Sequence, residues 1–282
     1  DVIDGSKTTV TQALWSDNLA ELSTFFTSSA LTNSQKAYYV NIHQKDPAAT
    51  GSAVQFAIAY GNQVGSGSLN NGGGTAGDSP SRAIYSQYKQ LLLSDTENAF
   101  TFKTGSGTYT TDSIYVINIE RARSKERLDP GNWELPLLNI TSRDSSATGS
   151  VAVSSTIVKL IDDSSTAAIT TELADSYNIV SGSITNGIFN STSPVYYGKV
   201  YPQYSALVLD GRKLDNELGF TTNTGSNSQG NNHYALFHSI SGSASAGSGS
   251  FSARNKETVS STIYFVRLNN ADYNYSNNPS YV

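Results

Sequence analysis

The chain alternates between short runs of β-branched and aromatic residues and stretches made of glycine and serine. This alternation limits it to strand-rich folds. Glycine-serine stretches begin at Gly65 (GSGSLNNGGGTAG), Gly105 (GSG), Ser181 (SGS) and Ser241 (SGSASAGSGS). Glycine permits positive φ angles and serine offers little packing surface, so such stretches favour turns and surface loops. No fixed repeat length separates them, and the pattern therefore predicts long loops between strands.

Several runs have the composition of strands. They are residues 37–43, 54–60, 100–102, 113–119, 204–209 and 262–268. The first two flank KDPAATGSA, whose proline, glycine and small polar residues favour a turn, so these two runs are expected to form a hairpin. Residues 19–26 are compatible with either a helix or a strand.

Helices are expected in three places: residues 80–93, 211–218 and 233–240. The first follows Ser79 and Pro80, which offer a capping side chain and a proline in the first turn. Its apolar side chains then recur at the i, i+4, i+7, i+8 spacing of an amphipathic helix. The second is expected to stop at Gly219, because glycine readily adopts the left-handed conformation that ends helices.

These elements predict a mainly β fold of antiparallel, sandwich-like sheets with one amphipathic helix near 80–93 and one or two short helices. The 282 residues suffice for a substantial core. Residues 141–250 are rich in serine, threonine and glycine, which predicts a subdomain inserted into a β-rich core domain formed by 1–140 and 251–282.

Composition narrows the classes of partner. The net charge of -5 does not favour a nucleic-acid-binding protein, which usually carries a basic face. The sequence contains no cysteine, which excludes disulfides, thiol nucleophiles and thiolate metal sites. No apolar run approaches the ~18 residues that a membrane helix requires. The expected partners therefore include neither nucleic acid nor a membrane.

No motif indicates catalysis. His233 and His238 stand five residues apart, which places them on different faces of a helix, and His43 lies alone in a predicted strand. The glycine-rich stretches lack the Gly-Lys-Ser/Thr of a phosphate loop, and no G-x-S-x-G elbow lies between a strand and a helix. The sequence therefore predicts no catalytic residue, no metal site and no cofactor.

Carboxylates cluster twice. Asp162-Asp163, in the sequence DDSS, is expected to be a solvated turn. Asp210, Asp215 and Glu217 share a short predicted helix with basic residues, which favours surface ion pairs. A glycosidase would instead need two carboxylates facing each other across a cleft.

Residues 120–134, ERARSKERLDPGNWE, form the densest charged stretch. One interpretation is a solvated, salt-bridged loop or helical turn that ends in a Pro130-Gly131 turn. The other is a contact between subunits, because arginine and tryptophan are favoured where protein interfaces bind most strongly. The candidate contact residues here are Arg121, Arg123, Arg127 and Trp133.

The segment that ends in NNADYNYSNNPSYV is rich in tyrosine and asparagine. Tyrosine buries a large area while keeping a hydroxyl to hydrogen-bond, which suits partly polar interfaces. Tyr273, Tyr275 and Tyr281 are therefore further candidates for contact residues. The alternatives are an ordinary packed strand with a frayed end and a ligand-binding surface.

Three segments carry a resemblance to a known family: SPSRAIYSQYKQLLL, DSIYVINIERARSKERLDPGNWEL and ARNKETVSSTIYFVRLNNADYNYSNNPSYV. Together they resemble virion structural proteins of large contractile-tailed phages related to phages of marine cyanobacteria. The resemblance lies mostly in positions 37–140 and 251–282, and it implies a component of the tail, baseplate or neck, with the baseplate favoured. It also implies a further strand-rich piece after NYSNNP, and it brings no catalytic residues with it.

The expected function is therefore non-enzymatic: a structural component of a phage virion, assembled in the host cytoplasm, that acts through contacts with other virion proteins and with copies of itself. Two alternatives remain open. The chain could be a receptor-binding or adhesin module for surface glycans, with its Gly/Ser loops at the sugar site. It could also be a polysaccharide depolymerase, which would need a carboxylate pair such as Asp210 and Glu120.

Overall fold

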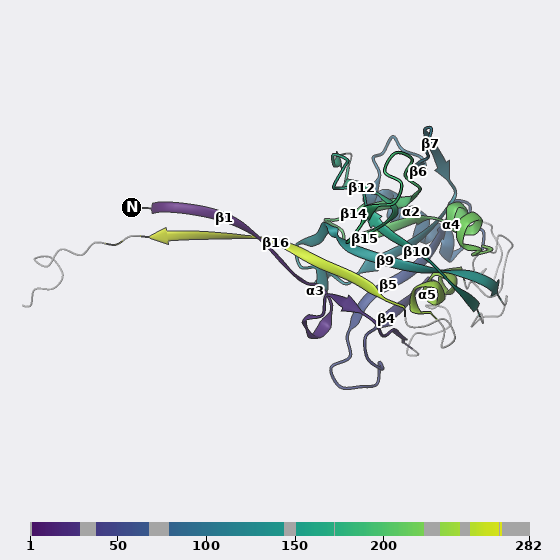
Figure 1. Cartoon of the computed structure of the whole chain (residues 1–282), viewed down its shortest axis with the longest axis horizontal. Helices are drawn as coiled ribbons and strands as arrows, with labels where there is room; N and C mark the ends of the chain where they lie inside the picture. The colour runs from purple at the N-terminus through teal and green to yellow at the C-terminus, as the bar shows by residue number, and fades with distance from the viewer. Residues whose placement is uncertain are drawn as a thin grey trace, which may run out of the picture. The chain divides into compact units, whose positions relative to one another are not determined.

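The fold is mainly β, as the sequence predicts, and most of its strands form one large antiparallel curled sheet (Figure 1). The computed structural model describes residues 2–28, 38–67, 79–143, 151–171, 173–222, 232–242, 249–264 and 266. A separate two-stranded sheet completes the β structure of these residues.

The order of strands in the large sheet does not follow the chain. It is β1 (Val2–Ala13), β16 (Phe251–Tyr264), β9 (Arg127–Arg143), β10 (Val151–Asp162), β12 (Asp175–Ser183), β14 (Tyr196–Tyr201), β15 (Ala206–Asp210), β8 (Ser113–Ile119), β5 (Val54–Asn62), β4 (Tyr39–His43) and β3 (Phe26–Thr27). The short strands β2 (Glu21–Leu22), β11 (Thr170–Thr171) and β13 (Gly187–Ile188) pair with members of this sheet, and β6 (Phe100–Lys103) with β7 (Thr108–Thr111) forms the separate hairpin. The helices are η1 (Ser16–Asn18), α2 (Pro80–Leu92), α3 (Arg121–Ser124), α4 (Gly211–Leu218) and α5 (Asn232–Ser241).

The predicted hairpin and the three predicted helices are confirmed. β4 and β5 pair antiparallel around the predicted turn, and α2, α4 and α5 occupy the expected segments. α4 ends at Gly219 with a φ of +65°. One detail is wrong: the Ser79 side chain does not cap α2, and the first turn closes on the Ser79 carbonyl, which accepts from Arg82 N–H.

The central strands bury both faces, and their alternating side chains enter two different cores. On β8, Tyr115 and Ile117 belong to the larger core, whereas Ile114 and Val116 belong to the smaller one. α2 covers the smaller core together with the β6–β7 hairpin. Tyr85 fastens these two parts, since its hydroxyl donates to the Thr111 carbonyl at 2.8 Å and accepts from Phe100 N–H at 3.1 Å.

The larger core is filled by aromatic rings from distant parts of the chain. The Trp15 ring lies 5.9 Å from Phe56 and 4.9 Å from Phe251, and the Phe56 and Phe251 rings lie 5.6 Å apart. Trp15 Nε1 also donates to the Phe251 carbonyl at 2.8 Å. α4 and α5 pack against β9, and α5 also packs against β4, β5 and β10. This core therefore joins Trp15 and Phe251, which lie 236 residues apart in the sequence.

The described residues divide into two compact units, one made of residues up to 10 with those from 257 onward and the other of those within 11–256. This division differs from the predicted subdomain at 141–250. β10, β12, β14 and β15 of that region lie in the large sheet between β9 and β8, so they complete the core sheet. Serine did not prevent strand formation there: Ser176 and Ser183 of β12 are only 1% and 4% exposed, within a strand that pairs with both β10 and β14.

Candidate functional site

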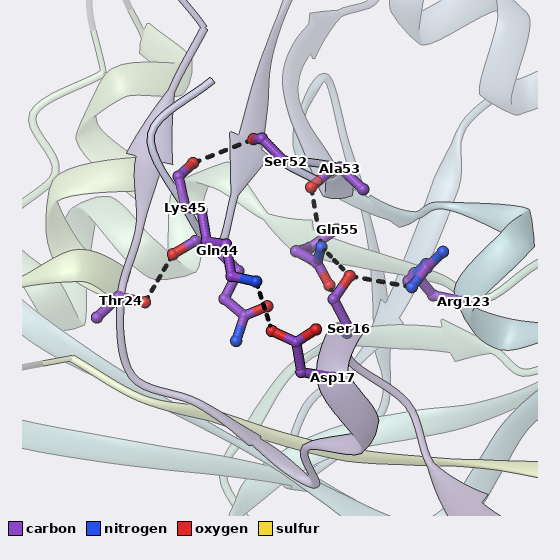
Figure 2. Close-up of polar contacts among 9 residues, drawn as sticks. All are labelled: Ser16, Asp17, Thr24, Gln44, Lys45, Ser52, Ala53, Gln55 and Arg123. Carbon is purple, nitrogen blue, oxygen red and sulfur yellow. Dashed lines mark hydrogen bonds and ion pairs between the residues drawn. The ribbon is translucent and has the colours of Figure 1, made fainter. Parts of the chain in front are cut away.

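The three arginines that the sequence proposes for a contact surface lie close together, at α3 and the start of β9. Two of them reach back to their own chain. Arg121 is exposed, and its Nη1 donates to the Gln203 carbonyl at 3.0 Å. Arg123 is half-buried, and its Nη1 donates to Ser16 Oγ at 3.0 Å (Figure 2).

Arg123 belongs to a polar network centred on the buried side chain of Gln55. Gln55 Nε2 donates to Ser16 Oγ at 2.7 Å and to the Ala53 carbonyl at 2.8 Å, and its Oε1 accepts from Ser16 N–H at 3.0 Å (Figure 2). Both ends of the amide are therefore satisfied by protein groups. An ion pair between Lys45 and Asp17, 2.8 Å long and exposed, lies at the edge of the network. The network fixes the turn after β1 against β5 and α3, which is a structural role.

Arg127 is half-buried in a pocket of about 260 Å³ beside Asp175, Tyr177 and Lys256. Lys256 in turn pairs with Asp129, whose Oδ1 lies 3.4 Å from the ammonium nitrogen. Of the three arginines, Arg121 presents the most open surface to a partner.

Trp133 is not a contact residue, which corrects the sequence-based hypothesis. Its side chain is 0% exposed and packs in the larger core. Its Nε1 donates to Asp162 Oδ2 at 2.5 Å. A bulge in β9 opposite Ala253 and Asn255 turns the indole inward, and Gly131 within that bulge adopts the positive φ of +79° that its turn sequence predicts.

The expectation that Asp162 and Asp163 form a solvated turn is also wrong. They are only 2% and 5% exposed. Asp162 accepts from Gly131 N–H and Ser164 N–H as well as from the indole, and Asp163 holds the backbone and side-chain N–H groups of Asn178. Burial raises the pKa of Asp162, while these donors lower it. Both carboxylates therefore anchor turns.

The carboxylate pair considered for a depolymerase is not a pair. Asp210 pairs with Ile114 at one end of β8, whereas Glu120 follows Ile119 at the other end. The six residue steps from Ile114 to Glu120 span roughly 20 Å of extended chain, far beyond the roughly 5–9.5 Å between glycosidase carboxylates. Asp210 is also buried while Glu120 is exposed.

The tyrosine-rich segment with Tyr273, Tyr275 and Tyr281 lies outside the described residues, so these three candidates remain predictions. Immediately before it, residues 2–10 of β1 and 257–264 of β16 lie side by side as an antiparallel pair, the β1–β16 ribbon (Figure 1). Within the ribbon, Val259 is 48%, Ile263 63% and Tyr264 71% exposed. The sequence placed a strand here but gave no signal that its apolar side chains stay uncovered.

Within the described ranges, no group of three or more acidic or histidine side chains is arranged to hold a metal ion. Over the same residues, every helix is too short or too polar to span a bilayer. Comparisons of the chain with protein-family models, with curated proteins and with solved structures found no match.

Proposed function

We propose that this chain is a non-enzymatic structural component of a phage virion, in the tail baseplate or neck, which acts through contacts with other virion proteins and with copies of itself. The observation that carries the proposal is the β1–β16 ribbon, whose apolar side chains are exposed on both faces. Val259 and Ile263 share one face of the strand because they are four residues apart, an even spacing, and Tyr264 lies on the other face. The resemblance of three sequence segments to virion structural proteins supports the same assignment.

The ribbon has the physical properties of a segment that is completed by another chain. A two-stranded ribbon is marginally stable in water unless something packs on it. β1 ends the strand order of the large sheet, and in the described chain β16 pairs with β9 only as far as Lys256. Both ribbon edges thus keep backbone N–H and C=O groups that a strand of a neighbouring subunit can pair with.

Purified virions of the phage that encodes the chain provide the direct test. Mass spectrometry should detect the protein in wild-type particles. Particles produced with Val259→Lys and Ile263→Lys together should lack it, because two charges in an apolar contact must be desolvated without partners. The matched control is Val64→Lys with Leu173→Lys, which places the same two charges on apolar side chains that are 66% and 56% exposed elsewhere.

Two results would overturn the proposal. The first is absence of the wild-type protein from purified particles. The second is equal incorporation of the ribbon variant and the control, provided that circular dichroism shows both to be folded.

A further inference from the structure

A pocket of about 440 Å³ opens on the second unit, and none of the residues used so far for assembly is among those that line it. Three segments build its wall: the β6–β7 turn at residues 103–105, the loop at 193–196 that leads into β14, and the exposed face of α4. The first of these includes the Gly-Ser turn at Gly105, whose glycine lines the pocket.

The charged side chains that line this pocket are all cationic, although the protein as a whole is acidic. They are Lys103, Arg212 and Lys213. Each lies over a tyrosine ring: Lys103 Nζ is 6.0 Å from the centre of the Tyr196 ring, and Arg212 Cζ is 5.6 Å from that of Tyr109. Contacts of this kind restrict the conformations of the long cationic side chains. These side chains therefore lose less conformational entropy when a ligand binds.

A buried carboxylate holds part of this arrangement in place. The Tyr109 hydroxyl donates to Asp210 Oδ2, and Asp210 Oδ1 accepts from Arg212 N–H at the start of α4. Asp210 is 1% exposed, so its two oxygens face these groups and not the pocket. The Tyr109 ring is thereby fixed beneath the Arg212 guanidinium.

The other nearby carboxylates are occupied elsewhere. Asp215 Oδ1 accepts from the N–H and hydroxyl of Thr222, and Glu217 pairs with Lys213 at 2.9 Å. Among the described residues, Lys103 and Arg212 have no carboxylate within 4.0 Å. Their donors are therefore available to an anion that enters the pocket.

Size and lining restrict the ligand further. Pockets that bind small organic ligands have volumes of about 300–1,000 Å³. This pocket falls in that range and is larger than a single oxyanion requires. Hydroxyl and amide groups of Thr104, Ser193 and Asn216 line it beside the cations. Such groups suit a ligand with several hydroxyls. We infer that the pocket binds an acidic saccharide, with Lys103 and Arg212 receiving its anionic groups and the polar side chains its hydroxyls.

Isothermal titration calorimetry on the full chain tests this assignment. The probes are an oligogalacturonate, a sulfated oligosaccharide, a neutral malto-oligosaccharide and inorganic phosphate. Lys103→Ala with Arg212→Ala should weaken binding of the acidic sugars by about 100-fold or more, since two charge-assisted hydrogen bonds of about 1.5–3 kcal/mol each are lost. Arg82→Ala with Lys89→Ala on α2 is the matched control, because it removes the same charge outside the pocket.

Binding of either acidic oligosaccharide, with weak or no binding of the neutral one, supports the inference, and the probe that binds more tightly identifies carboxylate or sulfate as the anion. Equal binding of the neutral sugar overturns it, as does phosphate binding as tight as that of the acidic sugars. No binding by any probe, or unchanged binding by the pocket variant, overturns it as well. None of these results depends on the virion assignment, since the ribbon variants leave the pocket intact.

Discussion

The two halves of β16 show how one strand can serve two different purposes. In its first half, Phe251, Ala253 and Asn255 are at most 1% exposed, and the first two belong to the larger core. In its second half, Val259 and Ile263 continue the same alternation but remain 48% and 63% exposed. Apolar side chains recur on the same face in both halves, but other parts of the chain cover that face only in the first half. Alternation therefore shows which side chains share a face, and it does not show whether that face is covered within the chain.

The largest loss of stability is expected when a buried side chain of the larger core is truncated. Trp133→Ala should lower the free energy of unfolding by about 3–5 kcal/mol, because it opens a cavity in the core and leaves Asp162 without its indole donor. Urea denaturation measures the loss, with Val259→Ala as the exposed counterpart at less than about 0.5 kcal/mol. Similar losses for both would show that the ribbon is packed in solution.

A smaller loss is expected from the Gln55 network. Gln55→Ala removes a side chain that satisfies Ser16 N–H and Ser16 Oγ in a buried position. Unsatisfied buried groups cost about 1–3 kcal/mol, and the same denaturation assay should report this range. Arg123→Ala removes only the outer contact and should cost less. The reverse order would show that the arginine, and not the amide, organises the network.

Asp210 leads to a prediction about how the stability of the second unit depends on pH. Burial raises its pKa from 3.8 to about 6, with Asp215 adding to the rise and Arg212 and the backbone N–H groups of α4 opposing it. Between these values the folded protein holds a proton that the unfolded chain has released. Stability therefore falls as pH rises from about 4 to about 6, by up to about 1.4 kcal/mol per pH unit from this group.

Asp210→Asn should remove that contribution, because the amide oxygen still accepts from Arg212 N–H but the side chain no longer ionises. The stability of the variant relative to wild type should rise from pH 4 to pH 6 and then level off. Thermal unfolding at several pH values measures the difference. A difference that stays constant with pH would show that Asp210 titrates normally despite its burial.

The smallest change in stability is expected in the ribbon. Val259→Lys with Ile263→Lys should alter the free energy of unfolding by less than about 0.5 kcal/mol, because both side chains are already exposed. Self-association at high concentration should nevertheless decrease, as measured by sedimentation. A loss of several kcal/mol instead would place these side chains in an internal core.

Local signals predicted local structure well. Pro80 and the apolar spacing that follows it marked α2, and Gly219 marked the end of α4, because these features depend on a few neighbouring residues. The hairpin of β4 and β5 was equally readable from its turn.

Burial of polar groups could not be predicted, because it depends on distant partners. The indole that contacts Asp162 comes from 29 residues away, and the Arg123 that contacts Ser16 comes from 107 residues away. In isolation, the DDSS sequence and the arginine-rich stretch have the composition of solvated segments. The saccharide pocket was missed for the same reason, since its cations come from β6 and α4.

The pairing of β1 with β16 also bears on when the chain becomes competent to assemble. β1 is synthesised before every other described strand, whereas its partner strand β16 is synthesised after all of them. A nascent or prematurely ended chain that lacks β16 therefore lacks the ribbon, together with the Phe251 side chain of the larger core. Under the assembly role proposed above, unfinished copies would be left out without any separate checking factor.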